Sequence, residues 1–308
     1  MDDKDKIILS IITPVYEPDP ILFQRTVHSV MAAMQENWEW IIVLHNTRSL
    51  SPEDVYRMTT DNGSVHVYTK TDDVHASWSP RNFALTKANG KYLYFIDHDD
   101  EVKKEFLLRG LRKMEEDDCD ILIGNAEKEL TASGLFEAPI VLDFPETEEG
   151  TIVPDDPDIK GRLLYGAITL SCRIFRRDLI VDNAITFDRD ILLTDDVLFA
   201  LRCYCKAKKI CVMPKLIAYT YVQNENSHLQ RMLREDSFPL EIYTEPVRVI
   251  VNLALENNIS PSGYLWMMMG MFTRIYQKSN MSAEKKRLLM SEIQKYIPLM
   301  KPSDKRKL

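Results

Sequence analysis

The sequence has no uninterrupted apolar run close to the ~18 to 20 residues that a helix needs to cross a bilayer. It opens MDDKDKIILSIITPVY, with acids where a secretory signal peptide has bases, and its apolar stretch runs directly into a Thr-Pro turn. We therefore expect a cytoplasmic chain that is at most peripheral to a membrane.

Cysteine and glycine are also scarce, at 5 and 10 of the 308 residues, which excludes a disulfide scaffold and collagen. An odd number of cysteines scattered through apolar segments is typical of reduced, buried thiols. Cys203 and Cys205 would diverge on one helix, and Cys211 completes no set of four ligands, so the pattern argues against zinc.

Basic charge is in deficit, because 39 Lys and Arg stand against 47 Asp and Glu, giving a formal net charge of −8. Such a chain repels a phosphate backbone, so nucleic acid is not an expected partner. The hydrophobic content of 45% is enough to bury one large core or two smaller ones.

The first half of the chain alternates apolar, β-branched runs with helical patterns, which is typical of βαβ units and a mostly parallel sheet. The expected strands are residues 7–15, 39–44, 64–69 and 91–97. Helical spacing follows the first strand, a capped helix begins at Ser51, and Asn89-Gly90 provides a left-handed stop for the helix over residues 78–88.

The second half is less regular. Residues 131–160 have little periodicity, which predicts a loop or irregular excursion. Further along, Thr194 is the expected N-cap of a helix. After residue 230 the pattern is helical throughout. We therefore divide the chain into an α/β domain over residues 1–230 and a helical C-terminal extension over residues 231–308.

Four polar residues, Asp97-His98-Asp99-Asp100, follow directly on the apolar strand KYLYFI. In an open α/β sheet, ligands bind beyond the carboxyl ends of strands, so these carboxylates should face the ligand crevice. Hard oxygen ligands suit Mg²⁺ or Mn²⁺ carrying a diphosphate. The alternative is a solvated acidic turn that caps the next helix.

The segments around this motif resemble the family 2 glycosyltransferases of the GT-A fold. The opening SIITPVYEPDPILFQRTVHSVMAA is similar to the family's first strand, loop and helix, and WSPRNFALTKANGKYLYFIDHDD is similar to its Arg-Asn pair, apolar strand and Asp-x-Asp-Asp motif. ITFDRDILLTDDVLFALRCYCKAKKICVMP resembles its acceptor-side segment, and the likeness covers residues 7–229. The fold it implies is a GT-A-like, Rossmann-type mixed sheet, mostly parallel and flanked by helices.

This resemblance implies roles for the acidic motif. Asp97 would hold the ribose or base side of a nucleotide sugar and share the metal, Asp99 would coordinate the metal across two phosphates, and Asp100 would support them. Arg81 would bind a phosphate or lock a carboxylate of the motif, its alternative being a surface salt bridge. The other positions placed at the donor are Thr13, Pro14, Val15, Tyr16, Glu17, Asn82 and His98. For Asn82, capping its own helix is the alternative.

On the acceptor side, Asp195-Asp196 falls where the family has an acidic pair, which implies that Asp196 is the base that deprotonates the acceptor hydroxyl. Carboxylates at a helix N-terminus are stabilised by the helix dipole in any case, so capping is the alternative, especially for Asp195. His228 follows Asn-Ser in a segment where such enzymes close over the donor, so it is a third candidate metal ligand beside Asp97 and Asp99, or it is an ordinary loop histidine.

The chain departs from the family after its second strand, where Leu44-His45-Asn46-Thr47 replaces the usual acids. The lost carboxylate would accept from a nucleobase. His45 or Asn46 could replace it, or Asp72 and Asp73 in the next loop could supply the acid; of that loop we place Asp73 at the donor.

The sequence thus predicts an inverting, metal-dependent transferase that moves a sugar from a nucleotide-diphosphate donor, most simply a UDP-sugar, to a hydroxyl of a glycan, glycolipid or glycoprotein. The rival is a nucleotide-sugar-binding protein without turnover. Residues 231–308 carry 13 basic and 8 acidic residues, a net charge of +5, against −13 for residues 1–230. This basic, apolar tail either lies on an anionic membrane or packs on the chain or in a homodimer.

Overall fold

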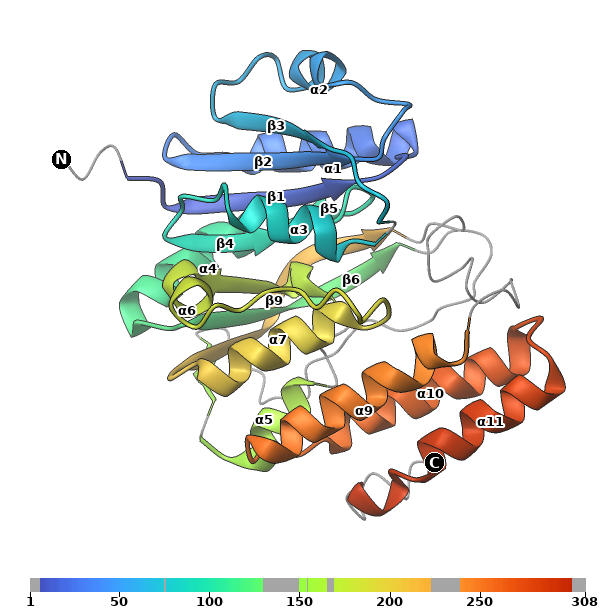
Figure 1. Ribbon diagram of the computed structural model, residues 1–308. Helices are drawn as coiled ribbons and strands as arrows, with labels where there is room; N and C mark the ends of the chain where they lie inside the picture. Colours follow the sequence, from blue (N-terminus) through green and yellow to red (C-terminus); the bar gives the residue numbers. More distant parts are fainter. Residues whose placement is uncertain are drawn as a thin grey trace. The chain divides into compact units, whose positions relative to one another are not determined.

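The computed structural model forms two compact units (Figure 1). It describes residues 6–74, 76–129, 150–153, 155–164, 169–222 and 239–300. The first unit comprises residues 1–152, 169–189 and 206–223, and the second comprises residues 153–168, 190–205 and 224–308. The helical unit therefore also draws in two segments from before residue 230.

The first unit is built on a mixed sheet in the order β3-β2-β1-β4-β8-β6-β9-β5, with β7 paired to β9 (Figure 1). Its first four strands run parallel and confirm the expected ones: β1 (Leu9–Val15), β2 (Trp38–His45), β3 (Val65–Lys70) and β4 (Tyr92–Phe95). The helices that connect them are α1 (Pro20–Ala33), α2 (Pro52–Met58) and α3 (Trp78–Leu85).

The rest of the sheet contains both directions. Its strands are β5 (Glu101–Val102), β6 (Ile121–Glu129), β7 (Thr151–Ile152), β8 (Arg173–Arg176) and β9 (Ile210–Val222), with helices α4 (Lys104–Asp117) and α6 (Arg177–Asp182) and the 3-10 turn η2 (Leu170–Cys172). β8 runs antiparallel to both β4 and β6, whereas β9 is parallel to β6. The structure thus confirms a mixed, mostly parallel sheet flanked by helices.

Local sequence explains where the helices begin. Asp19 accepts hydrogen bonds from the backbone N–H groups of Ile21 (2.9 Å) and Leu22 (3.1 Å) at the start of α1. Ser51 and Asp54 form a capping box at the start of α2, as the Ser-Pro-Glu-Asp sequence predicts. Both caps satisfy backbone donors that have no partner within the helix.

Gly90 does not have the left-handed backbone that the sequence predicted, since Gly150 is the one described glycine with positive φ. Its role is close approach: a Cβ at Gly90 would lie 2.4 Å from the backbone nitrogen of Ser10. The turn before β4 is therefore packed directly on β1.

Alternate strand residues build the main core of the first unit on one face of the sheet. Leu9, Ile11, Trp40 and Tyr94 are fully buried there with the apolar residues of α1 and α4. β1 and β2 are buried along their whole length, which explains why their sequences are mostly apolar rather than alternating with exposed polar residues.

The second unit is helical. It contains α5 (Pro157–Leu163), α7 (Asp195–Lys206), α9 (Glu241–Glu256), α10 (Ser262–Lys278), α11 (Ala283–Gln294) and the 3-10 turn η3 (Ile297–Leu299). α9, α10 and α11 pack on one another, and α5 packs on α10. The expected helical tail is thus confirmed over residues 239–300, whereas α5 corrects the expectation of irregular structure up to residue 160. None of the helices in the described ranges is long and apolar enough to span a bilayer.

Candidate active site

The carboxyl ends of β1, β2, β3 and β4 lie along one edge of the sheet, because these strands are parallel. The chain moves outward from β1 to β2 and β3, and then returns to the other side of β1 as β4. Open α/β sheets bind ligands where the strand order reverses in this way, so we take the carboxyl ends of β1 and β4 as the expected crevice. The residues that follow these two strands are therefore the first place to look for a ligand site.

The acidic turn, Asp97 to Asp100, occupies that position directly after β4. Asp97, His98 and Asp99 are half-buried, whereas Asp100 is buried. Nδ1 of His98 donates to the carbonyl of Pro14 in β1 at 3.3 Å. The turn is thus joined to both strands that border the crevice.

Arg81 in α3 binds the acidic turn through Asp97. It is only 4% exposed, and one of its Nη groups donates to Oδ1 of Asp97 at 2.9 Å. The other donates to Oγ of Ser77 at 3.2 Å, and the guanidinium carbon lies 5.4 Å from the centre of the Phe187 ring. Because the Asp97 side chain is 40% exposed, Arg81 fixes its carboxylate while leaving part of it open to solvent.

Asp100 is the inward member of the motif. Its Oδ1 accepts the backbone N–H of Val222, the last residue of β9, at 3.0 Å. Burial, followed by the nearby charges of Asp99 and Asp97, raises the pKa of Asp100 well above its ordinary value. Asp100 therefore joins the acidic turn to the end of β9, and Asp97 and Asp99 are the more accessible carboxylates of the motif.

Asn82 does not cap its own helix, because it lies within α3, whose N-cap position is Ser77. Its side-chain amide donates to the carbonyl of Phe187 and its side-chain oxygen accepts the N–H of Phe187, both at 2.9 Å. This two-point contact fixes the Phe187 backbone, and the Phe187 ring packs against Arg81. In the first unit, Asn82 thus contributes to the support of Arg81.

A second polar cluster lies at the carboxyl ends of β2 and β3. Nε2 of the buried His45 donates to Oδ1 of Asp72 at 2.8 Å, and Asp72 Oδ2 accepts from Lys70 at 2.8 Å and from Ser79 at 2.6 Å. Burial alone would raise the pKa of Asp72, but the hydrogen bonds from Lys70, Ser79 and His45 outweigh it and bring the pKa well below its ordinary value. Asp72 is therefore a firmly ionised, internally paired carboxylate.

Of the two acids expected in this loop, Asp72 is the one that the structure ties to His45, whereas Asp73 is exposed. Asn46 completes the cluster, since its side chain donates to the carbonyl of Val74 at 2.8 Å and accepts the N–H of Asp72 at 3.1 Å. Asn46 has a positive φ of 51°, which asparagine tolerates better than most residues.

The segment from Thr13 to Glu17 ends β1 at the same edge. The Thr13 hydroxyl is buried and accepts from the indole N–H of Trp40 at 3.0 Å, so Thr13 supports the sheet. Pro14 and Val15 complete the strand, and the next residue, Tyr16, is 44% exposed.

Glu17 has φ of 37° and accepts the N–H of Arg48 at 3.0 Å. Hydrogen bonds from Ser49 and then Arg48 lower the pKa of Glu17. Positive φ values at Glu17 and Asn46, in adjacent loops of this edge, are a form of backbone strain that clusters at functional sites.

The acidic pair Asp195-Asp196, which was expected on the acceptor side, lies in the second unit at the first turn of α7. Asp195 is 9% exposed and Asp196 is half-buried. Thr194 precedes them with φ of 59°, which is unusual for a β-branched residue and differs from the extended backbone expected of an N-cap. Its hydroxyl lies 3.4 Å from that of Tyr264. His228 is outside the described residues.

The chemistry of the edge follows from its donors. Asp97 and Asp99 present hard carboxylate oxygens, which are the ligands that magnesium and manganese ions prefer, and Arg81 binds Oδ1 of Asp97. Asp72, Phe187 and Val222 support the site but carry no recognisable motif. Sequence spacing could not identify the roles of the last two, which come from segments 105 and 122 residues away from their partners.

Comparison with known proteins agrees with this geometry. Residues 10–183 match the family described as Glycosyl transferase family 2. This match covers more than half of the 308 residues, so the chain belongs to that family.

Two curated relatives are similar in sequence to part of this chain. The chain is 28% identical over 223 residues to the poly(ribitol-phosphate) beta-glucosyltransferase of Bacillus spizizenii, covering 72% of this chain and 33% of that protein. It is 30% identical over 151 residues to the poly(ribitol-phosphate) beta-N-acetylglucosaminyltransferase TarS of Staphylococcus aureus (strain MW2), covering 49% of this chain and 24% of TarS. The chain thus spans a third or less of the length of these relatives.

Solved structures share the fold. The crystal structure of S. aureus TarS residues 1–349 with UDP-GlcNAc matches with a TM-score of 0.66 at 19% identity, covering 96% of this chain and 82% of that one. The mannosyltransferase PcManGT of Pyrobaculum calidifontis, in complex with GDP-Man and Mn²⁺, matches with a TM-score of 0.52 at 12% identity, covering 96% and 82%. The fold is therefore GT-A, as the sequence predicted.

Proposed function

We propose that this protein transfers a sugar from a UDP-sugar to a hydroxyl of a surface glycan or related polymer, with inversion at the anomeric carbon. The observation that carries the proposal is the acidic turn at the β1/β4 crevice, with Asp97 held by the buried Arg81. Both described relatives act on poly(ribitol-phosphate), which favours a polyol-phosphate acceptor for this chain over a glycolipid or glycoprotein.

Donor binding would depend on Asp97, Asp99 and Arg81. A divalent Mn²⁺ or Mg²⁺ held by the two carboxylates would neutralise charge on the departing diphosphate. Arg81 fixes the direction of the Asp97 carboxylate, so the site is preorganised before the donor arrives. His45, Asn46 and the exposed Asp73 are the proposed contacts to the nucleobase and ribose, beside the loop from Thr13 to Glu17.

Acceptor activation would depend on Asp196. A sugar or polyol hydroxyl is a weak nucleophile, so a carboxylate must accept its proton as the new bond forms. Asp196 is half-buried at the start of α7, and Asp195 beside it is buried, which suits a supporting role for Asp195. Displacement in a single step needs no covalent enzyme intermediate.

The metal assignment is tested by Asp99→Asn. We expect the variant to remain folded and to lose Mn²⁺-dependent binding of UDP-sugars in calorimetry, because an amide is a much poorer ligand for a hard cation. Asp178→Asn, at an exposed position in α6, is the matched control and should bind as the unmodified protein does. Donor affinity equal to that of the control would contradict the assignment.

The base assignment is tested by Asp196→Asn. Loss of a general base costs roughly 10²- to 10⁴-fold in rate, so transfer should fall by that factor while donor affinity is kept. Asp155→Asn, at an exposed position of the second unit, controls for the change of charge. Turnover within a few-fold of the control would assign Asp196 to helix capping.

The second candidate is a nucleotide-sugar-binding protein without turnover. It is favoured by one observation: Leu44 and His45 replace the family's acids, and the nearby carboxylate of Asp72 is already paired with Lys70, Ser79 and His45. Donor hydrolysis with Mn²⁺ separates the two candidates. Calorimetry with UDP-, GDP- and dTDP-sugars tests nucleobase choice, and tight binding of a GDP- or dTDP-sugar alone would overturn the expected UDP preference.

We further propose a cytoplasmic enzyme whose C-terminal helices either contact an anionic membrane or form a homodimer. Flotation with anionic liposomes at low and high salt tests the first, since electrostatic attraction to the leaflet weakens with salt. Light scattering tests the second.

A further inference from the structure

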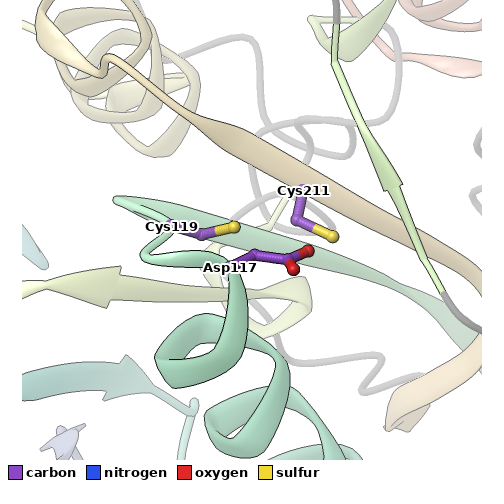
Figure 2. Close-up of side chains that lie close together, drawn as sticks. All are labelled: Asp117, Cys119 and Cys211. Carbon is purple, nitrogen blue, oxygen red and sulfur yellow. The ribbon is translucent and has the colours of Figure 1, made fainter.

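Three chemically reactive side chains meet away from the acidic turn, at the start of β9. Asp117 ends α4, Cys119 lies in the connection to β6, and Cys211 is the second residue of β9 (Figure 2). One ligand atom from each lies within 4.8 Å of the other two. The cluster forms because α4 and β6 bring Asp117 and Cys119 to β9, where Leu122 of β6 pairs with Cys211.

The backbone around the cluster directs these side chains together. Asp118 has φ of 52°, and the N–H of Cys119 returns to the carbonyl of Met114 at 3.0 Å, so the chain reverses sharply between Asp117 and Cys119. Gly150 approaches from the other side, where a Cβ would lie 3.0 Å from Sγ of Cys211. These features hold the two thiols in place before any ligand binds.

We propose that Asp117, Cys119 and Cys211 form a binding site for a soft divalent cation of the zinc class. Thiolate sulfur and carboxylate oxygen are both protein ligands of zinc, and three protein ligands leave the fourth tetrahedral position for water. Sulfur atoms bound tetrahedrally lie roughly 3.8 Å apart, so a spread of at most 4.8 Å needs only small side-chain movements. Zinc was not expected from the sequence because Cys211 completes no set of ligands with Cys203 and Cys205. In the structure, Cys211 instead lies beside Cys119 and Asp117.

A positive charge lies beside the cluster. Nζ of Lys113 on α4 donates to Oδ2 of Asp117 at 2.9 Å. Thiol ligands must be deprotonated to bind such a cation, so binding would release protons.

The burial of the three side chains indicates how a cation would reach the cluster. Both cysteines are fully buried, but the Asp117 side chain is 28% exposed, so solvent reaches the cluster through Asp117. A bound cation would fasten the end of α4 to β9, the strand whose far end meets Asp100. The cluster contains none of the residues proposed for glycosyl transfer.

The experiment is a Cd²⁺ titration of the reduced full-length protein, followed by the ultraviolet charge-transfer band of cadmium thiolates. We expect one equivalent to bind, and affinity to fall by at least ~10-fold in Cys119→Ser and in Cys211→Ser. Cys205→Ser is the matched control because Cys205 lies on α7, outside the cluster, and should titrate normally. The absence of a band, or a band that survives in Cys211→Ser, would overturn the proposal.

A second measurement uses the unmodified protein and does not depend on folding of the variants. Cd²⁺ should slow alkylation of Cys119 and Cys211 together, read by peptide mass spectrometry, while Cys205 reacts at an unchanged rate. Equal protection of all cysteines would refute a defined site. Asp99→Asn should retain the thiolate band, so a failure of the proposed catalytic metal site and a failure of this site can be told apart.

Discussion

At the scale of single residues, buried partners decide which carboxylates remain available for ligands. Arg81 takes one oxygen of Asp97, whereas Asp72 is surrounded by Lys70, Ser79 and His45. The first arrangement leaves a half-exposed carboxylate at the crevice, and the second uses its carboxylate to hold two loops together. Similar aspartates thus have different roles because their hydrogen-bond partners differ.

Asp72 gives the pH-dependent prediction. Its pKa is lowered from 3.8, so the folded protein binds its proton less readily than the unfolded chain does, and the ionised carboxylate stabilises the fold above that value. This stabilisation is lost as the pH falls below 3.8 towards the lower folded pKa. Asp72→Asn should cost about 1 to 3 kcal/mol near neutral pH, and this cost should shrink progressively as the pH falls below 3.8.

Urea unfolding of both proteins at about pH 7 and about pH 3 measures this difference. Asp73→Asn, at the exposed neighbouring position, should change stability little at either pH. A cost at Asp72 that is the same at both values would mean that the carboxylate charge is not what stabilises the loops.

Residue roles show the limit of sequence reasoning. The Asp-x-Asp-Asp motif was found from its place at the end of an apolar strand and the Arg-Asn pair from the resemblance to the family, and the structure joins Arg81 to Asp97. Spacing could not show that Asn82 clamps Phe187 or that Cys119 meets Cys211, because these contacts depend on strand register between distant segments.

At the scale of elements, the turn before β4 shows why a short glycine-containing link is needed. The Ser10 hydroxyl accepts from the N–H of Gly90 at 2.8 Å and donates to the buried Glu39 at 2.6 Å, and Glu39 accepts the N–H of Asn89 at 2.7 Å. These bonds join β1, β2 and the start of β4. They set the register that later brings the acidic turn beside the end of β1.

Gly90→Ala should therefore destabilise the first unit. The new methyl group would lie 2.4 Å from the Ser10 nitrogen and 2.8 Å from the Leu9 carbonyl carbon, which are backbone atoms that cannot move aside. We expect a loss of about 1 to 3 kcal/mol or more in denaturant unfolding, as for other overpacked sites. Gly63→Ala is the control, since a Cβ there meets nothing within 4 Å, and an unchanged midpoint for both variants would contradict the packing argument.

Helices and strands were predicted correctly where their sequence signal extends over several residues. Continuous apolar runs identified β1, β2 and β4, and the Ser-Pro-Glu-Asp signal identified α2. Two-residue strands such as β5 and β7 have no period to detect. β9 extends past Pro214 to Val222 because its pairing with β6 and β5 continues. A local sequence pattern that ends in proline does not indicate this continuation of the strand.

At the scale of the whole molecule, the chain passes repeatedly between its two units. The acidic turn and Arg81 belong to the first unit, while the pair at the start of α7 belongs to the second. The residues proposed for donor binding and the residue proposed as the base thus belong to different units of one chain. On that proposal, unfolding of the helical unit alone would abolish turnover.

The packing of the C-terminal helices decides between the two interpretations of the basic tail, and two adjacent leucines on α11 test it. Leu289 is fully buried in the helical unit, whereas Leu288 is 50% exposed.

Leu289→Ala should cost about 2 to 5 kcal/mol because it leaves a cavity, and Leu288→Ala should change stability by no more than about 0.5 kcal/mol. Urea unfolding followed by far-ultraviolet circular dichroism measures both changes in stability. If only Leu289→Ala is destabilised and Leu288→Ala does not weaken flotation with anionic liposomes, the apolar residues of the tail serve packing. If Leu288→Ala instead abolishes salt-sensitive flotation without loss of stability, the exposed face of α11 binds membrane and the packing interpretation fails.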